Sequence, residues 1–364
     1  MVVRLSVLAD ALQPEVLDPS GIGRAVDARL AGFLEAKRLA AVEGGFPAEV
    51  VDVLEGLALS GGKRIRPLLS VVGWQAAGGL GDRRPVLGAA AALEMFHVFA
   101  LIHDDVMDAS PTRRGRPSVH EALTARYQDR PDPARLGASA AILVGDLAMA
   151  WSDELLHTAG LTSAQLTAAL SVVAAMRTEL MYGQYLDLLA TGRPTADSTA
   201  ALRIARFKSA KYTIERPLHL GAVLAGAGED LCSALTAFAV PLGEAFQLRD
   251  DLLGVFGDPA CTGKPALSDL REGKHTVLVA LALQGATGTD RRLLETLLGD
   301  SDLDIEGAAR ICGVLESSGA RAAVEELIAS RHRQALQALD ACGLPAAAAA
   351  ALRSIASAAT ERTA

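Results

Sequence analysis

A long apolar segment, residues 84–108, ends in a cluster of acidic side chains. Up to residue 103 the segment would be apolar on most faces of a helix, which predicts a helix buried at the centre of the protein. The acidic residues Asp104, Asp105 and Asp108 follow. Residues four apart lie on one helix face, so the carboxylates of Asp104 and Asp108 should be adjacent. Adjacent carboxylates repel unless a cation lies between them, and magnesium that also holds substrate phosphates prefers such oxygen ligands. Taken alone, the pattern also fits the solvated end of an acidic helix.

The rest of the chain has the composition of packed helices. Hydrophobic residues make up 50% of the 364 residues and aromatic residues only 4%, so Ala, Leu and Val dominate. No convincing period of two indicates a strand, and no Ser/Gly-rich linker divides the chain. We therefore predict an all-α fold, with an irregular N-terminal arm at 1–20 and one domain at 21–364. Helices are expected at residues 21–43, 47–59, 67–77, 84–108, 134–158, 162–190, 198–225 and 230–256, with more between 274 and the end.

Charge and cysteine content argue against some classes of protein. The net charge of −8 and the pI near 5.5 do not suit a nucleic-acid-binding protein, which presents a basic surface. The four cysteines are widely spaced, which is typical of reduced thiols in a cytoplasmic protein. The first apolar run is too short for a signal peptide, and we expect no segment long and apolar enough to span a membrane.

A second acidic pair lies in the segment 230–256. Asp250 and Asp251 follow Gln247 by three and four residues, so the three share a helix face. Their neighbours are mostly apolar, and two buried carboxylates are costly unless they are paired or bind a metal. The pair is therefore a better indication of a metal site than two acids on a surface. An ion pair between helices, with Arg249 for example, explains it about equally well.

Several basic residues lie in loops or at helix ends near these acidic pairs. Any single Lys or Arg would normally be interpreted as solvated. Together with two acidic pairs, they indicate a site for two diphosphates and several magnesium ions, because Arg binds phosphate through two hydrogen bonds and Lys supplies a point charge. The basic residues are Lys63, Arg66, Arg113, Arg114, Arg116, Lys208, Lys211, Lys264 and Lys274.

Seven short segments occur in the order and spacing of one protein family. They are GGKRIRP (61–67), EMFHVFALIHDDVMD (94–108), TRRGRP (112–117), GQYLD (183–187), FKSAKY (207–212), FQLRDDLLGVFGD (246–258) and GK…DLREGKHT (263–276). Each is weak alone, but their shared order is a strong signal. On these motifs the chain resembles the trans-isoprenyl diphosphate synthases, or polyprenyl synthetases. The resemblance implies a bundle of antiparallel helices around a deep central cavity, and a homodimer.

The resemblance also implies a reaction, the head-to-tail condensation of isopentenyl diphosphate with an allylic diphosphate. Three magnesium ions are implied, with Asp104 and Asp108 as ligands of two and Asp250 as a ligand of the third. Gln184 and Asp187 would support this site, although a structural hydrogen bond between helices explains them about as well. Asp105 and Asp251 would be the other supporting groups.

Substrate roles follow from the same motifs. Isopentenyl diphosphate would be held by Lys63, Arg66, His97 and Arg114, and the allylic diphosphate by Arg113, Lys208, Ser209, Gln247, Lys264 and Lys274. Catalysis itself would rest on Asp104, Asp108, Lys208, Gln247 and Asp250. Ser209 stands where relatives often have Thr, which keeps the hydroxyl. His97 precedes Asp104 by seven residues, two helical turns, so the two share a face.

Two positions depart from the usual pattern of the family. The second acidic motif reads DDLLG, with Gly254 where many relatives have a third Asp, and we expect this change to be tolerated. The loop that follows reads GKPALSDL, with Leu267 where relatives often have Gly. We expect this second change to alter the loop, and with it the rate more than the reaction.

Residues below Asp104 on its helix should set the length of the product. Ala100, Phe99 and Phe96 precede it by four, five and eight residues, so they lie roughly 6 to 12 Å deeper. In the family, an aromatic residue at the position of Phe99 with a small one at Ala100 resembles bacterial geranylgeranyl diphosphate synthases. A twenty-carbon product is therefore predicted, with a farnesyl or longer product as the alternative. Phe96 and Phe99 also fit plain core residues, with the floor of the cavity set elsewhere or across a dimer.

Two alternatives come from other functional classes. A terpene cyclase also combines acidic magnesium motifs with an all-α bundle, but it has no second diphosphate to hold. The GGKRIRP segment and His97 therefore favour a synthase. A non-catalytic regulatory subunit is disfavoured because nearly all of the expected acids and cations are present.

Overall fold

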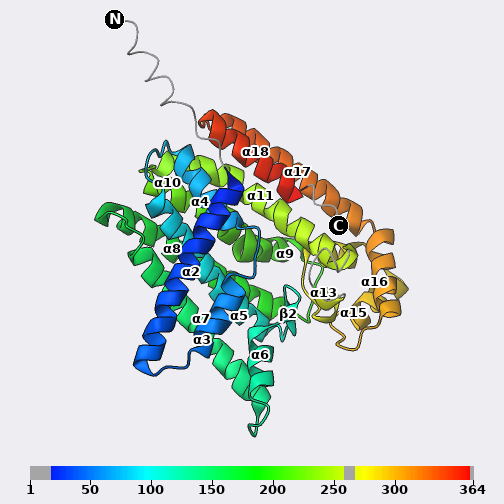
Figure 1. Ribbon diagram of the computed structural model, residues 1–364. Coiled ribbons are helices and arrows are strands. Elements are labelled where there is room, and N and C mark those ends of the chain that lie inside the picture. The colour runs from blue at the N-terminus through cyan, green and yellow to red at the C-terminus, as the bar shows by residue number, and fades with distance from the viewer. Residues whose placement is uncertain (1–17, 258–266, 361–364) are drawn as a thin grey trace, which may run out of the picture.

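The apolar segment that ends in acids forms α5 (Arg84–Met107), which lies inside a bundle of helices in the computed structural model (Figure 1). The structure describes residues 18–257 and 267–360. Pro85 stands in the first turn of α5, where a missing N–H breaks no helical hydrogen bond. Most side chains of α5 are buried, and the helix packs against α7, α4 and α2. Burial on several faces therefore explains its apolar sequence, as predicted.

Short connections join the helices around α5. The surrounding elements of the N-terminal half are α2 (Pro19–Gly44), α3 (Glu49–Ala58), α4 (Ile65–Ala76), α6 (Val119–Arg126) and α7 (Pro133–His157). Between α5 and α6, strands β1 (Thr112–Arg113) and β2 (Arg116–Pro117) pair as an antiparallel hairpin. The sequence analysis predicted only a loop here, because two-residue strands are too short to show a period of two.

The next part of the chain contains a π-helix that sequence analysis missed. Helix α8 (Ser163–Ala190) begins with a capping box between Thr162 and Gln165. The single helix predicted at 198–225 is in fact α9 (Ser198–Ala205), the π-helix η2 (Arg206–Glu215) and α10 (Arg216–Leu224). A π-helical turn holds one more residue than an α-turn and frequently marks a functional site. The apolar pattern alone did not reveal the change of helix type.

The C-terminal half packs along one long helix, α11 (Glu229–Phe256). Helices α17 and α18 run beside α11, and α15 and α16 lie together near one end of α17 (Figure 1). Residues 268–271 form one helical turn, α13, which was not among the helices predicted. The remaining elements are α13 (Ser268–Arg271), α14 (Val277–Gly285), α15 (Gly288–Leu297), α16 (Ile305–Ser317), α17 (Ala320–Ala341) and α18 (Ala346–Thr360).

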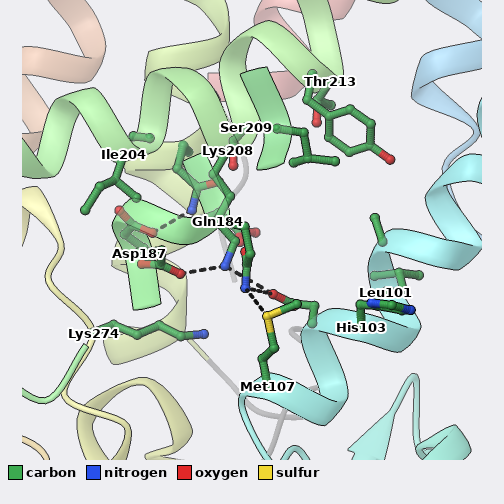
Figure 2. Close-up of a pocket in the computed structure, with 18 of the residues that line it drawn as sticks. Leu101, His103, Met107, Gln184, Asp187, Ile204, Lys208, Ser209, Thr213 and Lys274 are labelled. Atoms are coloured by element: carbon green, nitrogen blue, oxygen red, sulfur yellow. Dashed lines mark hydrogen bonds and ion pairs between the residues drawn. The ribbon is translucent and has the colours of Figure 1, made fainter. Parts of the chain in front are cut away.

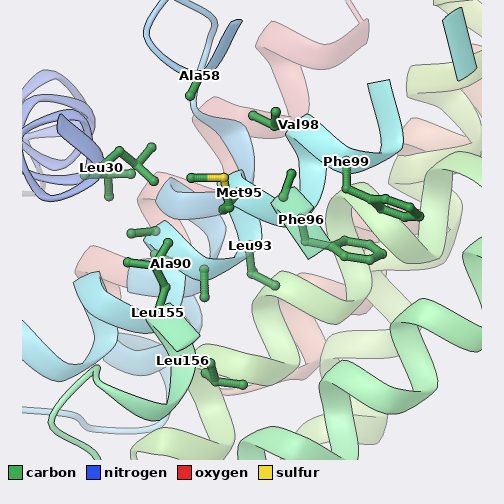
Figure 3. Close-up of a cluster of buried hydrophobic side chains, with 14 of the residues drawn as sticks. Leu30, Ala58, Ala90, Leu93, Met95, Phe96, Val98, Phe99, Leu155 and Leu156 are labelled. Atoms are coloured by element: carbon green, nitrogen blue, oxygen red, sulfur yellow. The ribbon is translucent and has the colours of Figure 1, made fainter. Parts of the chain in front are cut away.

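Three clusters of buried apolar side chains hold the bundle together. The largest surrounds α5 and includes Phe96 and Met95, which are almost fully buried (Figure 3). Helices α4 and α10 cross at short range, because a Cβ on Gly221 would lie 1.7 Å from the carbonyl oxygen of Ser70. Glycine is therefore required at this crossing.

The all-α prediction is confirmed, and most predicted helix ends lie within two or three residues of the observed ones. Helix α2 begins at Pro19, so the last two residues of the predicted arm, 1–20, are helical. Residues 1–17 and Lys264 lie outside the described part of the chain. The division into an arm and one domain at 21–364 remains a prediction.

One exclusion made from the sequence was wrong. By length and composition alone, three helices are apolar enough to cross a membrane: α5, α7 and α11. In the most apolar stretch of α5, 72% of the residues are buried inside the protein, against 44% for α11 and 28% for α7. The interior of the bundle therefore accounts for most of α5, whereas much of α7 is apolar and lies near the surface.

Candidate active site

A cavity of about 330 Å³ brings the two predicted acidic motifs together. Asp104 lines it from α5, and Asp250 and Asp251 line it from α11. Lys208 from η2 and Lys274 from the loop before α14 face the same space (Figure 2). Two carboxylate sites and two lysines from distant parts of the sequence thus meet at one place.

The first acidic motif is neutralised by these two lysines. Lys208 Nζ lies 3.1 Å from Asp104 Oδ1, and Lys274 Nζ lies 3.8 Å from Asp108 Oδ2. Burial alone would raise the pKa of Asp104, but the charges of Lys208, Arg113 and Lys274 outweigh it and lower that pKa. Burial and the negative charge of Asp104 raise the pKa of Asp108 to about 6. The pair therefore carries a repulsion that a further cation would relieve.

Asp105 does not line the cavity, although it directly follows Asp104, which does. Its side chain is 1% exposed and accepts hydrogen bonds from Arg113. The same guanidinium lies 3.4 Å from Asp104 Oδ2. Asp105 therefore positions Arg113 at the rim of the acidic site.

Helix α8 supplies a polar wall next to Asp104. Gln184 Nε2 donates to Asp104 Oδ1 at 3.2 Å, and Asp187 Oδ2 lies 2.6 Å from Lys208 Nζ (Figure 2). The backbones of α8 and η2 approach so closely that a Cβ on Gly183 would lie 2.5 Å from the backbone nitrogen of Lys208. The glycine of GQYLD thus allows the two helices to place Gln184 and Lys208 beside one carboxylate.

In the second acidic motif, the carboxylates of Asp250 and Asp251 face the cavity and the preceding arginine, Arg249, faces away. Gln247 Nε2 donates to Asp251 Oδ1 at 2.7 Å, and both side chains line the cavity with Asp250. Arg249 instead binds Glu325 of α17, with Nη to Oε distances of 2.8 and 2.7 Å. The alternative in which Arg249 neutralises the acidic pair is therefore wrong.

Arg66 and His97 form a second polar group in the lining of the cavity. The guanidinium of Arg66 lies 4.2 Å from the ring centre of Tyr212 and donates to Thr213 Oγ1 at 3.0 Å. His97 Nδ1 lies 3.2 Å from the hydroxyl of Tyr212. Burial, followed by the charge of Arg66 and of three further arginines, lowers the pKa of His97 well below its usual value. His97 is therefore a neutral hydrogen-bonding group in a positively charged region.

The β1–β2 hairpin adds Arg114 to this region. Arg114 Nη1 donates to Ser60 Oγ at 3.0 Å and to the carbonyl oxygen of Gly61, which ties the hairpin to the GGKRIRP segment. Burial and the neighbouring charges of Arg64, Arg113 and Arg66 lower the pKa of Arg114. Positive charges that repel one another in this way would be stabilised by a bound anion.

The sequence was compared with known protein families and with individual known proteins. Residues 47–313, most of the chain, match the family described as polyprenyl synthetase. The chain belongs to the polyprenyl synthetase family. The synthetase is therefore a prenyltransferase of the kind that elongates prenyl chains, and the family resemblance seen in its motifs is confirmed.

Individual relatives of the synthetase agree with this assignment. A geranylfarnesyl diphosphate synthase from Aeropyrum pernix is 35% identical over 283 residues, 74% of this chain and 84% of that protein. A geranylgeranyl diphosphate synthase from Saccharolobus solfataricus is 35% identical over 260 residues, 70% of this chain and 74% of that protein. The crystal structure of a geranylgeranyl pyrophosphate synthase from Corynebacterium glutamicum, complexed with isoprenyl diphosphate and magnesium, has a TM-score of 0.91 and 41% identity. It covers 95% of this chain and 100% of that one.

Most of the predicted site residues of the synthetase line the cavity. Those in the lining are Arg66, His97, Phe99, Ala100, Asp104, Arg113, Gln184, Asp187, Lys208, Ser209, Gln247, Asp250, Asp251 and Lys274. Predicted residues of the described part that are not in the lining are Lys63, Phe96, Asp105, Asp108 and Arg114. Their roles in the reaction remain predictions.

Sequence analysis missed several groups that shape the site. Arg64 is buried and binds Glu94 at 2.7 Å and Asp27 at 2.7 Å, so it anchors the GGKRIRP segment to α5 and α2. A signal was present, because the charged residue Glu94 stands in the most apolar part of α5 and needs a partner. Tyr212 and Thr213 were missed because the π-helix directs them toward Arg66.

The two departures from the family pattern lie close together in the synthetase. A Cβ at Gly254 would lie 2.0 Å from Asp269 Oδ2, so a side chain there would displace this carboxylate of α13. Asp269 Oδ1 lies 3.3 Å from Lys274 Nζ. Leu267, immediately before α13, has a φ of 72°, a left-handed conformation that favours glycine. The carboxylate of Asp269, from α13, thus occupies the space that a side chain at position 254 would fill.

The donor set fits magnesium held partly by substrate. Among the described residues, no group of three or more His, Cys, Asp or Glu side chains is placed to hold a metal. Paired carboxylates on α5, with the acids of α11 across the same cavity, suit an ion that keeps water and phosphate oxygens as its other ligands. Asp104, Asp108 and Asp250 are the residues that would hold it.

The lower end of the cavity is apolar. Phe99 and Ala100 line it, whereas Phe96 lies behind Phe99 with a distance of 5.2 Å between the ring centres (Figure 3). Leu180 and Met181 of α8 and Ile204 of α9 add further apolar side chains to the lining. The cavity therefore joins a charged mouth to a hydrocarbon-like interior.

Proposed function

We propose that the synthetase condenses isopentenyl diphosphate with an allylic diphosphate, releases diphosphate, and makes geranylgeranyl diphosphate. One observation carries the proposal: a single cavity is lined by the acids and lysines, by Arg66 and His97, and by apolar side chains. Two separate regions that can hold a diphosphate suit a reaction with two diphosphate substrates. A terpene cyclase would need only the first region.

The allylic diphosphate would bind between the two acidic motifs. Magnesium bound by Asp104, Asp108 and Asp250, with three ions in all, would neutralise charge on the leaving diphosphate. Lys208 and Lys274 already point into this space and can exchange their carboxylate partners for phosphate oxygens. Gln247, Arg113 and Ser209 line the same region and would orient the substrate before the C–O bond breaks.

Isopentenyl diphosphate would bind on the opposite side. Arg66 lines the cavity and offers a planar guanidinium, and neutral His97 beside it offers a hydrogen bond without adding charge. Lys63 and Arg114 would help to hold its diphosphate, and Arg114 is bonded to Ser60 beside the GGKRIRP segment. The double bond of isopentenyl diphosphate would then attack the allylic cation inside an apolar wall that keeps out water. The proton is lost to the released diphosphate, so no protein base is required.

The product length is assigned to α5. Phe99 is 5% exposed and lines the cavity, and the rise of five helical residues places it about 7.5 Å from Asp104 along α5. Ala100 beside it leaves room for the growing chain. This arrangement supports a twenty-carbon product, with a farnesyl or longer product as the alternative.

We also propose a homodimer in the cytoplasm. Helices α7 and α8 expose large apolar side chains, among them Leu143 at 69%, Tyr182 at 66% and Leu189 at 61%. Apolar side chains at these exposures on adjacent helices suit a surface covered by a second copy. Light scattering would give the number of copies.

The test is an incubation with magnesium, isopentenyl diphosphate and, in turn, five-, ten- and fifteen-carbon allylic diphosphates. We expect elongation with a twenty-carbon diphosphate as the main product, measured by chromatography after removal of the diphosphate. A hydrocarbon formed without isopentenyl diphosphate would instead identify a cyclase. No turnover with any primer would favour a regulatory subunit and contradict the proposal.

A further inference from the structure

Three side chains are stacked at the inner end of the cavity. Phe99 lines the cavity, and the ring of Phe96 lies behind it at 5.2 Å. The guanidinium carbon of Arg177 lies over the Phe96 ring, 5.1 Å from its centre. The Phe96 ring is 1% exposed and also meets Tyr212 edge to face at 6.0 Å. A positive charge therefore lies immediately beyond the second aromatic layer.

Helix α7 fixes this charge in place. Arg177 Nη2 lies 2.7 Å from Asp153 Oδ1 and 3.2 Å from Ser152 Oγ. Arg177 Nε is buried and has no hydrogen-bond partner among the described residues. The side chain, 22% exposed, is thus held across α7 and α8 by one end, with the rest of the guanidinium against Phe96.

Helix geometry places Arg177 at the same depth as Phe96. Gln184 of α8 is hydrogen-bonded to Asp104 of α5, so these two residues mark one level of the cavity. Arg177 precedes Gln184 by seven residues, about 10 Å, and Phe96 precedes Asp104 by eight, about 12 Å. The two helices therefore descend together from the acidic site to this stack.

We infer that Arg177 sets the upper limit of prenyl chain length, as a specificity-determining residue behind Phe99 and Phe96. The inference rests on the proposed elongation reaction. A chain that passes Phe99 must move the Phe96 ring, which the guanidinium holds through a cation–π contact. Beyond the ring the chain would lie against a charged group, and burying a charge in hydrocarbon is unfavourable. Arg177 thus acts both on the position of Phe96 and on the polarity behind it.

The test removes the charge of Arg177 in a protein whose first aromatic side chain, Phe99, has already been replaced by alanine. Phe99→Ala should lengthen the product only until it meets Phe96. Phe99→Ala/Arg177→Met keeps a side chain of similar length without charge, and its longest product should exceed that of Phe99→Ala by at least one five-carbon unit. Phe99→Ala/Arg177→Lys keeps a positive charge and should retain the limit of Phe99→Ala. Each enzyme is incubated with magnesium, isopentenyl diphosphate and the fifteen-carbon primer, and the products are sized.

A second double variant tests the same point with Phe96 and Arg177 both unaltered. Phe99→Ala/Asp153→Ala removes the ion-pair partner of Arg177 on α7, where Asp153 is 42% exposed, and should also lengthen the product. The inference is wrong if neither the Met nor the Asp153 variant makes a longer product than Phe99→Ala, or if the Lys variant lengthens it as much as the Met variant. Thermal unfolding shows that each variant is folded. If the unaltered protein elongates no primer, the proposed function fails instead.

Discussion

At Gly183, adding a single methyl group should force α8 and η2 apart beside the acidic site. A Cβ there would lie 2.5 Å from the backbone nitrogen of Lys208 and 2.8 Å from the carbonyl carbon of Phe207. Both obstacles are backbone atoms, so no side chain can turn aside. Ordinary contact at about 3.5 Å requires α8 and η2 to separate by about 1 Å. Gly183→Ala should therefore destabilise the protein by about 1–3 kcal/mol, as overpacking does.

The same displacement should lower activity. Lys208 Nζ lies 3.1 Å from Asp104 Oδ1, and Gln184 Nε2 lies 3.2 Å from the same oxygen. A separation of about 1 Å would break these contacts, and a misplacement of that size in an active site can reduce the rate by about 100-fold. We expect kcat/KM for prenyl transfer to fall by roughly 10- to 100-fold.

Gly56→Ala in α3 and Gly32→Ala in α2 are matched controls. A Cβ at either exposed helical glycine meets nothing within 4 Å. These changes should leave kcat/KM unaltered and raise stability by up to about 1 kcal/mol, because Ala is the better helix former. Urea unfolding and initial rates of prenyl transfer measure both effects. If Gly183→Ala is as stable as Gly56→Ala and as active as the unaltered protein, the close approach of α8 and η2 does not position the site.

Three further predictions concern the acidic site and the segment before α14. Gly254→Ala should push the Asp269 carboxylate away from Lys274. KM for the allylic diphosphate should rise by roughly tenfold, which corresponds to the loss of one charged hydrogen bond. An unchanged KM would show that Asp269 has no role in binding this substrate. Leu267→Gly should be more stable than Leu267→Ala by about 1–2 kcal/mol in urea unfolding, since both lose the same packing but only Gly relieves the left-handed backbone. Chelation of magnesium should abolish turnover with little change in Tm, because Lys208 and Lys274 already neutralise Asp104 and Asp108; unfolding on chelation would contradict this arrangement.

The parts of the fold that depend on local pattern could be predicted from the sequence. The apolar faces of residues 84–108 predicted a buried helix, and α5 is buried. The spacing of Asp104 and Asp108 predicted that they would be adjacent, and their mutual repulsion is visible in the raised pKa of Asp108, to which burial contributes most. Helical spacing and charge are properties of neighbouring residues, so a sequence displays them directly.

Features that depend on distant partners could not be predicted in the same way. Asp105 and Arg249 stand next to expected metal ligands, yet each faces away, toward Arg113 and Glu325 respectively. Which of two consecutive acids faces a cavity depends on the angle at which the helix meets its neighbours. The π-helix η2 is a similar case, because its apolar pattern resembles that of an α-helix while its extra residue per turn redirects Tyr212.

The relation between α5 and α8 would link the proposed ionisation of the allylic diphosphate to the length of the product. At one level the helices are joined by Gln184 and Asp104, and two turns lower Arg177 lies against Phe96. Both contacts lie on continuous helices, so helical rise fixes the distance between the level of Asp104 and that of Phe96, at about 12 Å along α5. A flexible floor would allow chains of several lengths. A floor carried by the same helix as Asp104 should instead favour one product, and changes to it should shift length in steps of one prenyl unit.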